Sequence, residues 1–114
     1  IPISSPQARR VENRIAGMDC NPYLGIAASL ACGYLGLLEQ ERPDKQFKGD
    51  AYDGEEAIPR ILGGALDLFD EAKDLHEVLG PDFARVYSIA KRAEYEEFLS
   101  VISPWEREHL LLNV

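Results

Sequence analysis

Three charged side chains near the start of the chain, Arg10, Glu12 and Arg14, have types and a spacing that would let them act together. If residues 9–15 form a strand, alternate side chains share a face, so these three stand about 6.6 Å apart on one side. Arginine grips phosphate or carboxylate oxygens, and a carboxylate holds a hard divalent cation. Phosphoryl transfer from a metal-bound nucleotide needs both kinds of group in one place. A solvated strand face with mutually neutralising charges has the same pattern, so the pattern alone leaves both interpretations open.

Two short extended segments would position this charged face. Residues 1–4 alternate apolar and other side chains, residues 5–7 (Ser-Pro-Gln) have turn chemistry, and residues 9–15 alternate again. On the second segment the face opposite the charges would carry Val11, Asn13 and Ile15, two of which are apolar and suited to packing against helices.

The remainder of the chain has helical patterns. Asn21-Pro22 is a start signal, and the helix predicted from there is apolar nearly all round over 22–38, which is typical of a helix buried between other elements. Its residues 39–42 are polar, and Pro43 is expected to end it. A long polar loop over 43–58 follows, which should carry function or be mobile.

Helical spacing resumes at Ile61 and runs on, or restarts, until Gly80-Pro81 ends it. A further long helix places apolar side chains towards a core, and Ser103-Pro104-Trp105-Glu106 opens a short terminal helix ending near Leu112. The core side chains expected on the long helix are Phe83, Val86, Tyr87, Ala90, Phe98, Val101 and Ile102.

The composition limits the possible partners. The chain has 114 residues, 46% of them hydrophobic, and a net charge of −8, and its only local basic excess lies near the N-terminus. An acidic body disfavours binding to nucleic acid and to anionic membrane, and no apolar run is long enough to span a bilayer.

A disulfide between Cys20 and Cys32 is excluded if the helix forms, so we expect two buried, unpaired thiols and a cytoplasmic protein. His76 and His109 are expected at the surface or at helix ends.

We therefore predict an α+β fold: a mainly helical fragment of about four helices with a short N-terminal two-stranded piece. An isolated two-stranded ribbon is only marginally stable in water. The apolar helix over 22–38 also needs more packing partners than the other helices supply. Residues 1–114 are accordingly expected to form a single unit, the C-terminal portion of a larger catalytic domain. A self-contained helical domain with a small hairpin is the alternative.

The strings Ala8-Arg9-Arg10-Val11-Glu12-Asn13-Arg14 and Asn21-Pro22-Tyr23-Leu24, with the later order of helices, resemble the C-terminal part of the glutamine synthetase catalytic domain. The resemblance implies a larger, mostly antiparallel active-site sheet to which the two-stranded piece belongs. It also implies that ATP activates the glutamate γ-carboxyl group as an acyl phosphate, which ammonia or an amine attacks. The implied parent is a homo-oligomeric ring.

The resemblance gives each charged side chain a role. Glu12 becomes a ligand of an active-site Mg²⁺ or Mn²⁺, and Arg14 the catalytic guanidinium that meets the glutamate γ-carboxylate and the transferring phosphoryl group. Arg10 falls where the family contacts nucleotide phosphates. The other metal ligands and most nucleotide contacts would lie upstream, so the isolated 114-residue piece is expected to be inactive.

The chain departs from ammonia-using enzymes of the family at Asn13, where they have an apolar residue, and at Ile15-Ala16-Gly17 and Gln7. The string Val11-Glu12-Asn13-Arg14, followed by Gly17 and Asp19 before Asn21-Pro22-Tyr23, resembles the γ-glutamyl-polyamine synthetase branch, which joins glutamate to an amine such as putrescine. Ammonia ligation stays open, as does a noncatalytic helical module in which the three charges form a surface ion-pair ladder. Tyr52 lies near where some relatives carry a modified tyrosine, but its flanks differ.

Overall fold

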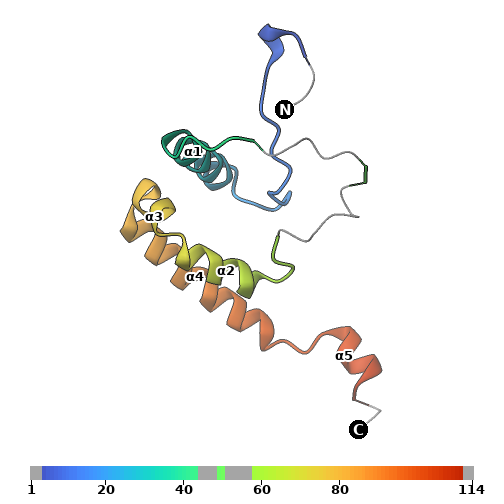
Figure 1. Ribbon diagram of the computed structural model, residues 1–114. Helices are drawn as coiled ribbons and strands as arrows, with labels where there is room; N and C mark the ends of the chain where they lie inside the picture. Colours follow the sequence, from blue (N-terminus) through green and yellow to red (C-terminus); the bar gives the residue numbers. More distant parts are fainter. Residues whose placement is uncertain (1–3, 44–48, 51–57, 112–114) are drawn as a thin grey trace. The chain divides into compact units, whose positions relative to one another are not determined.

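A computed structural model describes residues 4–43, 49–50 and 58–111 (Figure 1). The chain divides into two compact units, Ile1–Pro43 and Asp44–Val114, each of which is described by itself. Helices dominate both units, and the described residues contain no strand. The mainly helical prediction is therefore confirmed, whereas the two-stranded piece is not seen. Tyr52 lies outside the described residues.

The segment expected to pair as strands instead begins with a short 3₁₀ turn, η1 (Pro6–Ala8), closed by a hydrogen bond from Ala8 N to Ser5 O at 3.0 Å. Most of the first expected strand, residues 1–3, lies outside the described residues. Residues 9–15 form neither helix nor strand. Two physical reasons account for this: the described residues offer no strand to pair with, and the Asn13 side chain takes the Ile15 N–H at 3.0 Å.

The first unit is built on α1 (Pro22–Leu38), which starts where the sequence predicts. Asn21 Oδ1 accepts hydrogen bonds from the N–H groups of Tyr23 at 3.0 Å and Leu24 at 3.4 Å, and Pro22 occupies the first turn. This cap satisfies two of the N–H groups that a helix start leaves without partners. The entry to α1 is thereby fixed next to the charged segment.

The end of α1 is formed by the backbone rather than by the proline at position 43. Gln40 adopts a left-handed φ of 56°, so the N–H of Glu41 reaches the Gly36 carbonyl at 2.9 Å and the Gln40 N–H reaches the Leu37 carbonyl at 3.3 Å. This pair of bonds is a Schellman closure, here with glutamine in the place that glycine usually takes. The helix consequently stops at Leu38.

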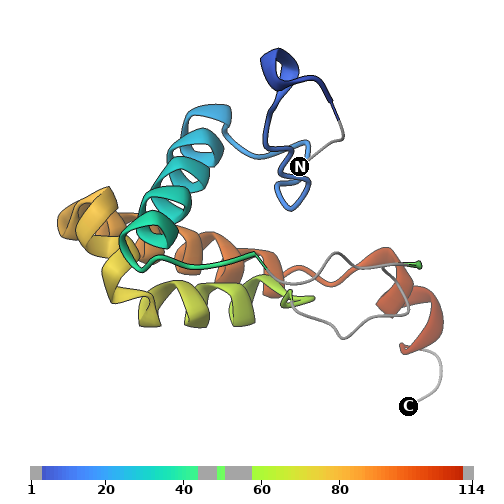
Figure 2. The ribbon, with the colours of Figure 1, turned by 45° about the horizontal axis from the view of Figure 1, so that its top comes forward.

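In the second unit, α2 (Leu62–Glu71) and α3 (Lys73–Leu79) both pack along α4 (Pro81–Leu99), as Figures 1 and 2 show. The helical pattern over 61–79 does restart, because Ala72 leaves the helical region with φ −78° and ψ 67°. Gly80, at φ 96°, then turns the chain into α4, a conformation that glycine adopts without steric cost. Among the described residues of this unit, Leu66, Ala84 and Ser88 are buried.

Two contacts hold α2 and α3 against their neighbours. A Cβ placed on Gly63 would lie 3.0 Å from the Tyr95 ring, so the absence of a side chain permits the close approach of α2 to α4. The His76 ring meets the Phe69 carbonyl oxygen at 2.7 Å, and its centroid lies 4.8 Å from that of the Phe69 ring. His76 lies in the last turn of α3, at a helix end as expected, and is a half-buried link between α3 and α2.

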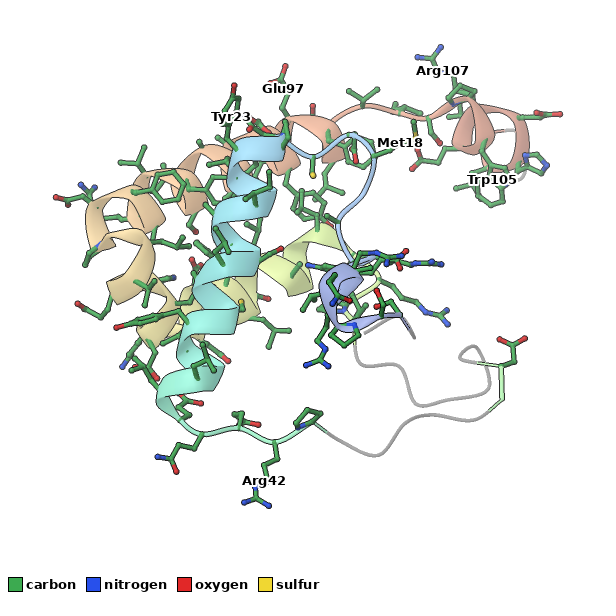
Figure 3. The ribbon with its side chains drawn as sticks, turned by 90° about the horizontal axis from the view of Figure 1, so that it is seen from above. Met18, Tyr23, Arg42, Glu97, Trp105 and Arg107 are labelled. Carbon is green, nitrogen blue, oxygen red and sulfur yellow. The ribbon has the colours of Figure 1, made fainter. Side chains whose placement is uncertain are left out.

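The terminal helix α5 (Pro104–His109) begins at the predicted signal. Ser103 Oγ accepts from the Glu106 N–H at 3.2 Å, and the Ser103 N–H donates to Glu106 Oε2 at 2.7 Å, which completes a capping box. The Ser103 N–H and hydroxyl lower the pKa of Glu106. Trp105 and Arg107 point to opposite sides of α5 (Figure 3).

Much apolar surface remains exposed. Positions 83, 86, 98, 101 and 102, which the pattern assigns to a core, are between 41% and 70% exposed, and on α1 the side chains of Ile26, Leu30 and Leu37 are at least 62% exposed. Cys20 and Cys32 are unpaired, as expected, but both are exposed, so the expectation of buried thiols is wrong. Within the described part of the chain, no helix has the length and apolar character needed to cross a membrane.

Candidate functional site

The structure brings Glu12 and Arg14 together. Arg14 Nη2 lies 2.7 Å from Glu12 Oε1, and Arg14 Nε donates to the same oxygen at 3.0 Å. The two side chains therefore share one side of the segment, as the alternation predicts. Because both bonds end on Oε1, the other carboxylate oxygen accepts no hydrogen bond from the described residues.

This ion pair is open to solvent. The Arg14 side chain is 82% exposed and the Glu12 side chain 42%. Ion pairs at that exposure contribute only about 0–1 kcal/mol, since water competes for both partners. The ion pair therefore contributes little to the stability of the fold, and little free energy opposes its rearrangement around an incoming ligand.

Arg10 is not part of this contact. It is exposed, and it makes no hydrogen bond or ion pair with the described residues. The three-member ladder expected for a noncatalytic module is therefore incomplete, because only its two C-terminal members meet. The guanidinium of Arg10 retains all its donors for a partner outside the described residues.

Asn13, between the paired residues, ties the segment to α1. Its Nδ2 donates to Ser29 Oγ at 2.9 Å, and Ser29 Oγ in turn donates to the Gly25 carbonyl at 2.8 Å. The sequence pattern places Asn13 opposite the charges and expects the apolar members of that face to pack on helices, but the contact with α1 is made by the polar Asn13. Sequence reasoning missed Ser29, because a hydrogen bond across 16 residues leaves no local signal. The apolar members of that face, Val11 and Ile15, are at least 71% exposed.

The residues present fit a share of a metal and nucleotide site rather than a whole one. Glu12 offers a carboxylate oxygen, the ligand type that Mg²⁺ and Mn²⁺ prefer, and Arg10 and Arg14 offer donors suited to phosphate oxygens. The described residues contain no group of three or more His, Cys, Asp or Glu side chains able to hold a metal ion. A metal at Glu12 would need further ligands from outside the described residues.

Comparison with known proteins places this arrangement in context. Residues 1–110 match the family described as the glutamine synthetase catalytic domain. The chain is 35% identical over 115 residues to type-1 glutamine synthetase 2 of Dictyostelium discoideum, covering 96% of the chain and 22% of that relative. It is 35% identical over 107 residues to a glutamate–isopropylamine ligase of a Pseudomonas species, covering 90% of the chain and 23% of the ligase.

A third relative is similar to the same degree. The γ-glutamylputrescine synthetase of Escherichia coli strain K12 is 36% identical over 116 residues, covering 99% of the chain and 24% of the enzyme. The chain thus spans about a quarter of the length of these curated relatives. No solved structure matches the chain significantly.

Proposed function

Because the chain belongs to the glutamine synthetase catalytic-domain family, we propose that it is the C-terminal portion of an ATP-dependent ligase that joins the glutamate γ-carboxylate to an amine. Both compact units would belong to this one portion. The exposed apolar side chains of α1 support the proposal, since a helix without a polar face needs cover from further polypeptide. The alternative of a noncatalytic helical module is disfavoured, because Arg10 makes no ion pair with the described residues.

The chemistry begins with attack of a γ-carboxylate oxygen on the terminal phosphorus of ATP, which breaks the bond to ADP and forms an acyl phosphate. In this proposal Arg14 binds the γ-carboxylate and the transferring phosphoryl oxygens through its planar guanidinium. Its contact with Glu12 uses Nε and Nη2, so Nη1 would meet the substrate oxygens while that contact is kept. Arg10 would neutralise nucleotide phosphates as a second cation.

Glu12 would hold the divalent cation. Its second carboxylate oxygen can bind a metal while Oε1 keeps its bonds to Arg14, so the two roles are compatible. Mg²⁺ or Mn²⁺ bound there would offset the charge on the phosphoryl group. The amine nitrogen then attacks the acyl carbon, loses a proton and expels phosphate, which carries away one oxygen of the original carboxylate.

For the acceptor we propose a polyamine such as putrescine. The departures at Asn13 and at residues 15–17 support this branch, and an acidic protein of net charge −8 attracts a dication. By their names, two of the relatives act on isopropylamine and putrescine, and a third is a glutamine synthetase. Ammonia is therefore the second candidate for the acceptor. The parent would be a cytoplasmic homo-oligomeric ring that binds neither nucleic acid nor membrane.

The observation that carries the proposal is the Glu12–Arg14 pair, a carboxylate and a guanidinium in contact within the matched region. The test is ADP release by the full-length protein with glutamate, Mg²⁺ or Mn²⁺, and either putrescine, isopropylamine, ethanolamine or ammonia. We expect release that depends on glutamate and is fastest with putrescine. Fastest release with ammonia would assign a glutamine synthetase instead, and no glutamate-dependent release would refute the ligase.

A further inference from the structure

The Asn13 amide is fixed at both ends. Its Nδ2 donates to Ser29 Oγ at 2.9 Å, and its Oδ1 accepts the Ile15 N–H at 3.0 Å. Since one end is a donor and the other an acceptor, the two bonds together define which way the amide points. An aspartate of the same shape could keep the second bond but could not donate the first.

Ser29 is equally committed. Its hydroxyl proton goes to the Gly25 carbonyl at 2.8 Å, so a lone pair is left to accept from Asn13. Ser29 lies on α1, whose start is fixed by the Asn21 cap and whose end is fixed by the Schellman closure. The bond therefore joins the loop segment to a well-defined helix.

This link acts on Glu12 and Arg14 through the backbone. Asn13 separates the two residues, and its side chain contacts α1 whereas theirs contact each other. Their exposed ion pair is too weak to fix the segment by itself. Among the hydrogen bonds of the described residues, the bond to Ser29 joins this three-residue stretch to a helix.

We propose that Asn13 and Ser29 form a positioning pair that holds the Glu12 carboxylate and the Arg14 guanidinium in register with α1. This inference rests on the proposed roles of Glu12 and Arg14. Misplacing a reacting group by about 1 Å can cost about 100-fold in rate, so a small backbone shift at position 13 would matter.

Truncation at this pair should leave the fold intact. Asn13 and Ser29 both line a hollow of about 330 Å³ beside α1, so a smaller side chain enlarges an existing space. Neither residue is part of a closely packed core, where truncation is most costly. Ser29→Ala removes the acceptor, Asn13→Asp removes the donor, and Ser29→Thr keeps a hydroxyl that can still reach the helix carbonyl.

Ser100 supplies a matched control. Like Ser29 it donates from Oγ to a helix carbonyl, here Glu97 O of α4 at 2.7 Å, although Ser100 lies just after the end of that helix. Among the described residues it receives no bond from an asparagine. Ser100→Ala therefore loses the same local bond without touching the charged segment. Any effect of Ser29→Ala beyond that of Ser100→Ala reports the link to Asn13.

The test uses the full-length protein, with kcat and KM from glutamate-dependent ADP release and Mn²⁺ affinity from direct titration. We expect Ser29→Ala and Asn13→Asp each to lower kcat about tenfold and to weaken Mn²⁺ binding about tenfold, with smaller changes in KM. The double variant should lose no more than either single one, because both remove one link. Ser29→Thr should recover at least half of the wild-type kcat.

Each other result has one meaning. Wild-type kcat and Mn²⁺ affinity in Ser29→Ala would overturn the positioning pair while leaving the ligase intact. Equal losses in Ser29→Thr and Ser29→Ala, or a loss in Ser100→Ala as large as that in Ser29→Ala, would also overturn it. An inactive wild-type protein would instead remove the proposed function, and with it the roles on which the pair depends.

Discussion

The Arg14 guanidinium places two donors on a single oxygen of Glu12, Nη2 at 2.7 Å and Nε at 3.0 Å. The second carboxylate oxygen and the remaining nitrogen of the guanidinium stay available for other partners. A pair of this kind can bind a cation on one side and an anion on the other without first being taken apart. Its high exposure means that substrate binding meets little resistance from the resting contact.

The first prediction concerns the carboxylate of this pair. Glu12→Ala in the full-length protein should abolish turnover and weaken Mn²⁺ binding, because the substitution removes a proposed ligand of the metal. Direct Mn²⁺ titration and ADP release measure the two effects. Glu41→Ala, which removes another exposed carboxylate in the same unit, should change neither. Unaltered turnover in Glu12→Ala would exclude Glu12 from the mechanism.

The second prediction concerns the guanidinium. Arg14→Lys keeps the charge but loses the planar set of donors, so kcat should fall by about 100-fold, the loss typical when an aimed donor to a transition state is removed. Arg42→Lys is the control, since Arg42 projects into solvent beyond the end of α1 (Figure 3). Steady-state kinetics with saturating glutamate gives the comparison, and equal kcat values would contradict the assignment.

The third prediction tests the approach of α2 to α4. A Cβ on Gly63 would meet Tyr95 at 3.0 Å, whereas one on Gly64 meets Pro59 at 3.5 Å, an ordinary contact. Alanine gains about 1 kcal/mol over glycine inside a helix, so Gly64→Ala should slow hydrogen exchange in α2. Gly63→Ala should exchange faster than Gly64→Ala, because Tyr95 must move. Identical exchange in the two variants would refute the close approach.

The fourth prediction is a dependence of stability on pH. A hydrogen bond from Ser88 and the Arg92 guanidinium hold the pKa of Asp70 below its ordinary value of 3.8. Arg92 contacts Asp70 Oδ2 through Nη2 at 2.5 Å and also reaches Asp67 at 2.9 Å. A carboxylate with a depressed folded-state pKa stabilises the fold above its ordinary pKa and loses that contribution as pH falls through the folded value.

Asp70→Asn should therefore lower Tm at pH 7, and the difference from wild type should shrink once the pH falls below about 4. Thermal melts of both proteins across that range measure it. Glu97→Gln is the control, since the Glu97 side chain points away from the helices in Figure 3 and makes no ion pair with the described residues. A constant Asp70→Asn difference from pH 7 to pH 3 would contradict the assignment.

The helices could be predicted because their ends are decided locally. Asn21 and Ser103 cap the helices that follow them through bonds to residues two or three positions away. The strand expected over 9–15 is not seen, since a strand needs a partner that the described residues do not supply. The break at Ala72 has no glycine or proline to mark it, so the pattern could not locate it.

The candidate site divides in the same way. The contact of Glu12 with Arg14 follows from the alternation of side chains along an extended backbone, so the sequence predicts it. Ser29 could not be found by pattern, because its bond to Asn13 joins residues 16 positions apart. The apolar side chains that the pattern assigns to a core on the long helix are largely exposed among the described residues.

The most direct test of the ligase follows one oxygen atom. The full-length protein would be given glutamate labelled with ¹⁸O in both γ-carboxylate oxygens, together with ATP and putrescine, and the released phosphate analysed by mass spectrometry. If the γ-carboxylate attacks the terminal phosphorus of ATP, each phosphate released with the amide product carries one ¹⁸O atom. Amide formation with unlabelled phosphate would contradict the account.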